Sequence, residues 1–403
     1  MQSVAQSWLV YRLTGSVILL GTIGFASQIP VFLLAPFGGT IADRFDRGKI
    51  LILTQSWAMV LAAVLATLTL SGAVQIWHLF VIAAGFGIAN AFDIPARQAF
   101  AVDMVGREDL LNAIALNSSM FNGARIVGPA IAGILVAAVG EGWCFFGNAV
   151  SYIAVLTGLL MMRISPVLRS RQGSAFAHIA EGFKYVAKTR PIRAILLLLG
   201  LVSLMGMPYA VLMPVMADQY LGGGSSTLGF LMGASGIGAV IAALLLASRK
   251  EIFGLGRWVA YACAAFGIGL VLFSLSRNFW LSVLFLIPVG FSMMTQMSSS
   301  NTLVQAMVPN ELRGRVMSLY SMMFMGLAPF GSLLAGTLAG YVGAPETIAI
   351  GGLVCIVGAI VFRLNLPKMK WQARRMIVSM QMTGGEPASK AAFNQPPTAN
   401  TTP

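Results

Sequence analysis

Eleven apolar runs, each long enough to cross a lipid bilayer as a helix, constrain the fold more than any other feature of the chain. About 20 helical residues span the ~30 Å hydrocarbon core of a membrane. Only 10% of the 403 residues are charged and 57% are hydrophobic, whereas roughly 25% of residues are charged in soluble domains. This composition excludes a soluble enzyme, a disordered regulator and a nucleic-acid binder. The runs occupy residues 17–42, 50–70, 76–98, 112–139, 143–163, 192–217, 225–247, 258–276, 279–305, 315–342 and 346–364.

An apolar, helix-compatible segment precedes the first full run. As a helix, residues 1–13 rise only about 20 Å, which is less than the hydrocarbon core needs. The segment has neither a basic start nor a small-residue cleavage site, so it is a poor signal peptide. We expect it to be the second half of a helix whose first half is missing, because the start is misassigned or the chain is a fragment. With it, the chain has twelve predicted spans.

Lys and Arg are distributed unequally between the two sides of the predicted membrane. Of 26 basic residues, 23 fall on one side, Arg12 and Arg277 fall on the other, and Arg125 lies within a span. Short loops rich in Lys and Arg remain in the cytoplasm, so the sequence predicts that both termini are cytoplasmic. The net charge of +13 is therefore a topology signal, and contact with anionic inner-leaflet lipid is its consequence. No nucleic-acid partner is expected.

The two halves of the chain repeat each other in the same direction. An offset of 203 residues aligns the span at 112–139 with that at 315–342, with 13 identities in 36 ungapped positions. In this alignment Gly128 and Gly133 coincide with Gly331 and Gly336. Two parallel halves of six spans form a known transporter architecture.

This repeat divides the chain into four parts, namely a six-helix half (1–163), a cytoplasmic linker (164–191), a second six-helix half (192–366) and a cytoplasmic tail (367–403) with a disordered distal part. Within the linker, helical spacing predicts a short amphipathic helix over Ser174–Thr189, lying on the cytoplasmic membrane surface. Its apolar face carries Phe176, Ile179, Phe183 and Val186. The helix is either a plain connection or a regulatory site.

The loop after the run at 17–42 carries four residues at a characteristic spacing: Gly39, Asp43, Arg44 and Arg47. Glycine allows close helix contact, a carboxylate is favoured near a helix N-terminus, and the arginines can pair across the loop. The pattern resembles the signature loop of the major facilitator superfamily, which implies a latch between the two halves in one state. Two positions depart from the family pattern, since Asp46 replaces a usual glycine and Gly48 a usual basic residue.

The span at 112–139 carries a glycine–proline pattern made of Gly123, Gly128, Pro129 and Gly133. Small residues let backbones approach and proline bends a membrane helix. The pattern resembles the motif of superfamily antiporters, most of which are exporters; the alternative is packing alone, with the direction of transport open. Further matches at 90–98, 112–117 and 313–316 resemble the branch of the enterobactin (siderophore) exporter and related secretion carriers.

Asp93 is the one acidic residue within a predicted span, and such a group is a functional candidate by default. Asn90 and Arg97 share its helix face, and Gln296 is its counterpart in the repeat. One hypothesis places Asp93, Arg97 and Arg125 around a central cavity, where Asp93 exchanges protons. The other has Asp93 paired with Arg97 near the inner surface, fixing packing or a gate, because it lies only ~10 Å from the inner helix end.

Other polar residues in the spans must face protein or water. They line the central cavity or form hydrogen bonds between helices. The candidates for the substrate cavity are Gln2, Gln6, Gln28, Asn90, Asn122, Gln296 and Ser299. Asp218, at an outer helix end, is expected to be solvated, and the three cysteines are expected to be buried small apolar residues.

Enzymatic machinery is not expected. The chain has no Gly-x4-Gly-Lys-Ser/Thr loop for ATP, and its two histidines, His78 and His178, fall on opposite sides of the membrane. We therefore expect no cofactor and no metal, and an ion gradient as the energy source.

The resemblance implies an all-α polytopic membrane protein with the major-facilitator fold. It implies a monomeric secondary transporter of a prokaryotic inner membrane that exports a small organic molecule (a siderophore, drug or metabolite) as protons enter, by alternating access. Three alternatives remain, namely an uncoupled facilitator or importer, a membrane receptor or scaffold with a larger soluble domain, and an intramembrane enzyme with paired catalytic groups.

Overall fold

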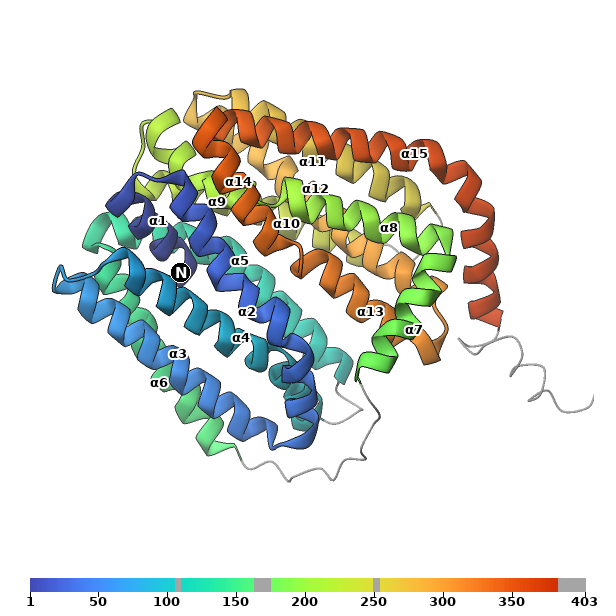
Figure 1. The fold of residues 1–403 in the computed structure, drawn as a ribbon, viewed down its shortest axis with the longest axis horizontal. Coiled ribbons are helices and arrows are strands. Elements are labelled where there is room, and N and C mark those ends of the chain that lie inside the picture. The colour runs from blue at the N-terminus through green and yellow to red at the C-terminus, as the bar shows by residue number, and fades with distance from the viewer. Residues whose placement is uncertain (106–109, 163–174, 249–253, 383–403) are drawn as a thin grey trace, which may run out of the picture.

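The computed structural model describes residues 1–105, 110–162, 175–248 and 254–382, and within these ranges it contains helices and turns but no strand. Figure 1 shows two bundles side by side, the first half at the lower left and the second at the upper right. The all-helical fold follows from the apolar composition, because a helix pairs its own backbone groups inside lipid.

The first half consists of six consecutive helices: α1 (Gln2–Thr14), α2 (Val17–Arg44), α3 (Arg47–Leu70), α4 (Ile76–Val105), α5 (Leu110–Val139) and α6 (Glu141–Met161). Short turns with glycine in the left-handed region join several of them, at Gly15, Gly72 and Gly140. Within this half, α3 packs against α4 and α6, and α2 packs against α4.

The second half follows the linker helix α7 (Ala175–Lys188). It consists of α8 (Arg190–Leu201), η1 (Val202–Gly206), α9 (Tyr209–Val215), η2 (Met216–Tyr220), α10 (Ser225–Ala247), α11 (Leu255–Leu275), α12 (Phe279–Met307), α13 (Asn310–Met325), α14 (Ala328–Val342) and α15 (Ala344–Met382). Here α12 packs against α10 and α11, and α11 packs against α15.

Ten of the predicted spans are helices that are long and apolar enough to cross a membrane. The run at 112–139 corresponds to α5, whose described apolar part is the shorter helix Val127–Val139. The segment at 1–13 is helical, as α1. The sequence therefore placed every span on a helix.

Three spans differ in detail from the expectation. The run at 192–217 is not one regular helix, because Pro208 and Pro214 lack the backbone donor that continues the hydrogen-bond ladder, and π-helical turns η1 and η2 flank α9. The run at 315–342 breaks between α13 and α14, just before Pro329. The last helix does not end near residue 364 but continues through Pro367 to Met382, into the predicted tail. Residues 383–403, predicted to be disordered, lie outside the described part.

The linker helix α7 begins and ends within one residue of the predicted bounds. Its predicted apolar face is divided, because Val186 is buried in the core while Phe183 is 61% exposed. The helix packs against α13, where Glu181 forms an ion pair with Arg315. Phe176 and Ile179 lie outside the described side chains.

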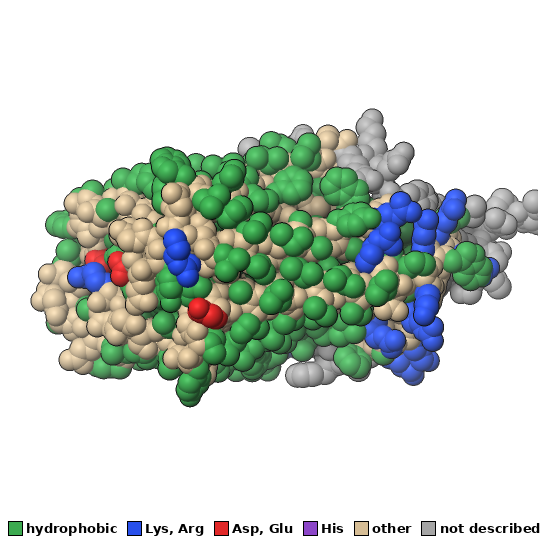
Figure 2. Space-filling view, turned by 90° about the horizontal axis from the view of Figure 1, so that it is seen from above, with side chains coloured by type: hydrophobic (Ala, Val, Ile, Leu, Met, Phe, Trp, Pro, Cys, Tyr) green, Lys and Arg blue, Asp and Glu red, His purple; other side chains and the backbone are tan. Residues whose placement is uncertain are grey.

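Charge separates the two ends of the bundle. Figure 2 shows Lys and Arg gathered at one end, which we call the basic end, with an apolar band between it and the opposite end. The basic end carries the loop between α2 and α3, at the lower middle of Figure 1, together with α7 and the end of α15, which lie on the right. At the opposite end Arg12 pairs with the buried Glu141, with Nε to Oε1 at 2.7 Å.

Candidate functional site

Two helix crossings join the halves: α2 with α14, and α5 with α10. At the first crossing, a Cβ atom on Gly21 would lie 2.5 Å from the carbonyl oxygen of Ser332 and 2.7 Å from Cα of Gly336. Distances this short leave no room for a side chain. Only glycine permits this approach of the two backbones, as at small-residue contacts in membrane helices generally.

The second crossing repeats this geometry. A Cβ atom on Gly133 would lie 2.5 Å from the carbonyl oxygen of Ser225 and 2.6 Å from Cα of Gly229. A Cβ atom on Gly229 would in turn lie 2.8 Å from the carbonyl oxygen of Pro129. Since Gly133 and Gly336 are aligned by the repeat, the two crossings are related by the same internal symmetry. Both lie toward the opposite end of the bundle, because α2 and α10 begin there and α5 and α14 end there.

Toward the basic end, two further glycines of α5 make no such close contact. No described atom lies within 4 Å of a Cβ atom built on Gly123 or Gly128 of α5. On α2, Gly38 packs against its own half, where its Cβ would lie 2.2 Å from the carbonyl oxygen of Ala91. The glycine–proline pattern thus divides into a contact part, Pro129 and Gly133, and an open part.

Aromatic rings and one polar pair fill the middle of the α2–α14 crossing. Phe330 lies edge-on to Phe25 and to Phe32, with ring centroids 5.9 and 5.8 Å apart. The amide Nε2 of Gln28 donates to Oγ of Ser332 at 3.4 Å. The predicted cavity residue Gln28 therefore lies between the halves.

A second polar contact joins the halves at the opposite end. The hydroxyl of Tyr11 donates to Oδ2 of Asp218 at 2.9 Å, from α1 to η2. Asp218 is exposed, as expected, but it also has this partner. The sequence carried no signal for this pair, because 207 residues separate its members.

Asp93 lies within the first half, on the face of α4 that packs against α3. Its Oδ2 accepts a hydrogen bond from Nε of Arg97 at 2.9 Å, and its Oδ1 accepts another from Nη2 at 3.1 Å. Oδ1 also accepts from Nε2 of Gln55 at 2.6 Å and from the hydroxyl of Thr54 at 3.0 Å. Asp93 is 8% exposed, and four donors bind it as a carboxylate. Thr54 and Gln55 were not singled out from the sequence, because they occur as isolated polar residues in an apolar run.

Of the neighbours predicted for Asp93, Arg97 is in contact with it. Asn90 is exposed although it is one turn away on α4. The side chains of Arg125 and Asn122 lie outside the described residues, so a three-residue group with Arg125 stays a prediction.

The candidate residues of α12 are fully buried. Four side chains in consecutive turns are 1% exposed: Thr295, Gln296, Ser299 and Ser300. In the described part of the chain, each has a buried side-chain nitrogen or oxygen without a hydrogen-bond partner. Such groups are costly in a packed interior. They are therefore candidates for water or substrate contacts.

Gln2 lies away from the crossings between the halves. Its Oε1 accepts a hydrogen bond from Nδ2 of Asn148 on α6 at 3.1 Å, while its Nε2 is buried without a described partner. Gln6 is half-buried on the same helix. This hydrogen bond lies within the first half, and a place for Gln2 in the central cavity stays a prediction.

The signature loop is held by its own half. Arg47 donates from Nε to the carbonyl of Ala42 at 3.1 Å and from Nη1 to the carbonyl of Ala99 on α4 at 2.9 Å. Asp46, the departure from the family pattern, caps α3 by accepting from the backbone N–H of Gly48 and of Lys49, which is the favoured role of aspartate at a helix start. Arg44 is exposed and Gly39 has no described atom near its Cβ position. The side chain of Asp43 lies outside the described residues.

Metal-ligating side chains are scattered over the described residues. No group of three His, Cys, Asp or Glu residues that could hold a metal ion occurs among them. The thiols of Cys144, Cys263 and Cys355 are free, the last two buried as expected.

Comparisons with known proteins identify relatives over nearly the whole chain. Residues 1–394 match the transmembrane secretion effector family. The staphyloferrin A transporter of Staphylococcus aureus is 27% identical over 91% of this chain and 92% of its own. The multidrug efflux pump Tap of Mycolicibacterium fortuitum is 24% identical over 91% of each chain. The enterobactin exporter EntS of Escherichia coli is 23% identical over 83% of this chain and 80% of its own.

Solved structures share the fold. A point mutant of the nucleoside transporter NupG superposes with a TM-score of 0.74 at 13% identity, covering 90% of this chain and 94% of its own. A bacterial homologue of the human lysosomal transporter Spinster, described as inward-facing and occupied, gives a TM-score of 0.63 at 16% identity over 94% of each chain. The helical repeat, the paired crossings and the match of residues 1–394 lead to one conclusion. The chain belongs to the transmembrane secretion effector family of the major facilitator superfamily and is a multi-pass secondary transporter, not an enzyme.

Proposed function

We propose that the protein is a proton-coupled exporter of a small organic molecule, working as a monomer in the inner membrane of a prokaryote with both termini in the cytoplasm. In this proposal the basic end is the cytoplasmic end, because short Lys- and Arg-rich loops stay inside. The structure then corresponds to an inward-facing state. One observation supports this assignment: both glycine crossings are closed at the opposite end, whereas no described atom of another helix lies within 4 Å of a Cβ atom built on Gly123 or Gly128.

The substrate class rests on the relatives. Those described above are a siderophore transporter, a siderophore exporter and a multidrug efflux pump. A siderophore, a drug or a metabolite of similar size is the cargo that we propose. In the transport cycle, the crossings would separate at the opposite end and close at the basic end, which exposes the site to each side in turn.

A transport assay tests direction and coupling. Inside-out vesicles containing the purified protein receive an acidic lumen and a panel of staphyloferrin A, enterobactin and cationic dyes. The proposal predicts that at least one compound accumulates only while the pH gradient lasts. Equal concentrations of every compound inside and outside the vesicles, both with and without the gradient, would contradict proton coupling.

Asp93→Asn tests whether Asp93 is the coupling acid. This variant removes the titratable group, and Thr54→Val is its matched control because it removes one hydrogen bond to the same carboxylate. If Asp93 exchanges protons, only Asp93→Asn loses gradient-driven accumulation, and it keeps equilibrium exchange. Equal behaviour of the two variants would assign Asp93 a packing role.

The glycine crossings test the conformational part of the proposal. In Gly133→Ala, the new methyl group meets backbone atoms at 2.5 and 2.6 Å, and overpacking of this kind costs about 1–3 kcal/mol. The closed contact with α10 should therefore be destabilised and transport reduced about tenfold. Gly147→Ala on α6, where no described atom of another helix lies within 4 Å of the Cβ position, is the control, and transport by this variant should be unchanged. A Gly133→Ala variant that transports normally would contradict the role of the crossing.

One observation favours a second candidate, an uncoupled facilitator. Asp93 accepts hydrogen bonds from Arg97, Gln55 and Thr54, and these contacts hold its carboxyl group in the packed contact between α3 and α4. A carboxylate held in this way is suited to a structural role. Gradient-independent transport by the unmodified protein would establish this second candidate.

A further inference from the structure

A cavity of about 440 Å³ lies inside the second half at the basic end, away from both crossings between the halves. It is lined by residues of α8, α11, α12 and α15 and is open on one side. Its volume falls within the ~300–1,000 Å³ range of small-molecule sites. The transport cycle proposed above makes no use of it.

The lining of this cavity combines an apolar interior with positive charge. Among the 14 described residues that line it, three are cationic, none is acidic, and the other eleven are apolar or glycine. The apolar part includes Leu303 and Met307 of α12 and Phe362 and Leu366 of α15. A ligand that matches this lining has a hydrocarbon part and an anionic group.

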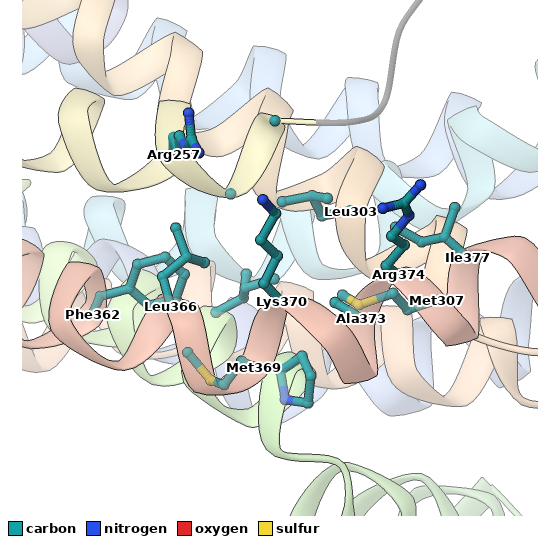
Figure 3. A pocket seen from close by; sticks show the side chains of 14 residues that line it. Arg257, Leu303, Met307, Phe362, Leu366, Met369, Lys370, Ala373, Arg374 and Ile377 are labelled. Atoms are coloured by element: carbon teal, nitrogen blue, oxygen red, sulfur yellow. The ribbon is translucent and has the colours of Figure 1, made fainter.

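The three cations come from two of the helices that line the cavity. In Figure 3, the side chain of Lys370 extends from α15 toward α11, on which Arg257 lies, and the side chain of Arg374 extends from α15 farther along the same helix. All three residues are exposed. Lys370 and Arg374 are four residues apart and thus share a helix face. An anionic group held here could contact α11 and α15 at the same time.

Two tryptophans place these cations at the level of the lipid headgroups. Trp258 follows Arg257 on α11 and Trp371 follows Lys370 on α15, and their side chains are 43% and 67% exposed. Tryptophan rings favour the membrane–water interface. The helix α11 has 21 residues, about the length of one bilayer crossing, and Arg257 lies in its first turn. The mouth of the cavity therefore lies where phospholipid phosphates are concentrated.

We propose that this cavity binds one acidic phospholipid from the leaflet at the basic end. An acyl chain occupies the apolar interior, and the phosphate lies among Arg257, Lys370 and Arg374. Basic pockets between membrane helices are suited to acidic lipid headgroups. The bound lipid joins α11 to the part of α15 that continues beyond Pro367, and so holds the end of that helix against the bundle.

The test measures lipid binding to the full-length protein in a neutral detergent by native mass spectrometry. The probes are phosphatidylglycerol, phosphatidylcholine with the same acyl chains, and glycerol phosphate, which is a headgroup without chains. We expect one phosphatidylglycerol to be retained with the highest affinity, and neither phosphatidylcholine nor glycerol phosphate to displace it. Equal retention of the two lipids, or displacement by glycerol phosphate, would overturn the proposal.

Charge removal separates the cavity from the basic surface around it. The double variant Arg257→Gln with Lys370→Gln should weaken phosphatidylglycerol binding about 30-fold, since each cation contributes about fivefold at a membrane surface. The matched control is Lys368→Gln with Arg375→Gln. It removes the same charge from α15 at positions that do not line the cavity. An equal loss in both double variants would mean general surface attraction and would overturn the proposal.

Filling the cavity tests the acyl chain without changing the charge. Ala373→Phe places a ring in the interior and leaves all three cations in place. It should weaken phosphatidylglycerol binding about tenfold or more while the size-exclusion profile stays that of the unmodified protein. If this variant does not fold, Ala373→Leu replaces it. Undiminished binding by a folded, filled variant would overturn the proposal.

Discussion

The two halves of this transporter use buried polar side chains in opposite ways at positions that the repeat makes equivalent. In the first half, Asp93 accepts four hydrogen bonds, from Thr54, Gln55 and Arg97. The offset of 203 residues carries Asp93 to Gln296 and Arg97 to Ser300. Both counterparts bury a polar atom that has no partner among the described residues.

The packed neighbour helix accounts for this difference. In the first half, α3 supplies Thr54 and Gln55 to α4. In the second half, α11 packs against α12 in the equivalent place, and the residues that it buries include Val259, Ala260 and Cys263. A satisfied network stiffens a contact, whereas unpaired polar groups weaken it. The first half should therefore be the more rigid half, and the polar face of α12 the part that rearranges.

The largest effect is expected for Asp93→Ala. It leaves Arg97 and Gln55 without this acceptor, while Thr54 keeps the backbone carbonyl of Leu51, and we expect the free energy of unfolding to fall by about 2–3 kcal/mol. Chemical unfolding in detergent, followed by tryptophan fluorescence, measures this change. Asn90→Ala, an exposed position on the same helix, should change stability by less than about 0.5 kcal/mol. Equal stability of the two variants would remove the basis of the comparison.

Gln296→Met is expected to act in the opposite direction. Methionine has a similar volume, and it removes an amide nitrogen that is buried without a described partner. The free energy of unfolding should rise by about 1–2 kcal/mol, because an unpaired buried polar group is costly. The same unfolding experiment measures the rise. A loss as large as that of Asp93→Ala would mean that Gln296 is paired in solution.

The same substitution, threonine to valine, can be compared at one position in each half. Thr54→Val removes a hydrogen bond to Asp93 and should lower the free energy of unfolding by about 1 kcal/mol. Thr295→Val removes a hydroxyl that has no described partner and should leave stability unchanged or slightly higher. Hydrogen exchange of the α3 and α12 backbones gives an independent measure. A loss of stability in Thr295→Val as large as that in Thr54→Val would contradict the difference between the halves.

The smallest effect is expected for Ser299→Ala. The hydroxyl is buried and unpaired among the described residues, so its loss should change the free energy of unfolding by less than about 0.5 kcal/mol. The measurement is again chemical unfolding, with Ser282→Ala as the control. Ser282 donates to Oγ of Ser276 at 2.9 Å in the same helix bundle, and its loss should cost about 1 kcal/mol. A larger loss at Ser299 than at Ser282 would contradict the prediction.

Much of the fold follows from local sequence patterns. Apolar runs place the spans because a helix in lipid needs a continuous apolar stretch, and the spacing of Val186 and its neighbours predicts α7. The path of α15 beyond Pro367 was not predicted, because proline usually ends a helix and here tertiary packing of Met369 and Ile377, both buried, continues it.

The candidate site was less accessible to sequence reasoning. The pattern found Asp93 and Arg97 because they are four residues apart on one helix. It did not find Gln55, which lies 38 residues away, or the contact of Tyr11 with Asp218. Such pairs depend on how helices cross, which a single sequence does not encode in any local pattern.

In α2, the glycine crossing lies much nearer to the start of the helix than to its end. Along α2, Gly21 lies about 6 Å from the start of the helix and about 34 Å from its end at Arg44, at 1.5 Å per residue. If the crossing acts as a fulcrum, a rotation of about 10° moves the long arm by about 6 Å and the short arm by only about 1 Å. The basic end can thus widen or close about this point with little disturbance at the opposite end. Opening the opposite end to cargo needs a different fulcrum, nearer the basic end, and the glycine contacts must then come apart rather than pivot.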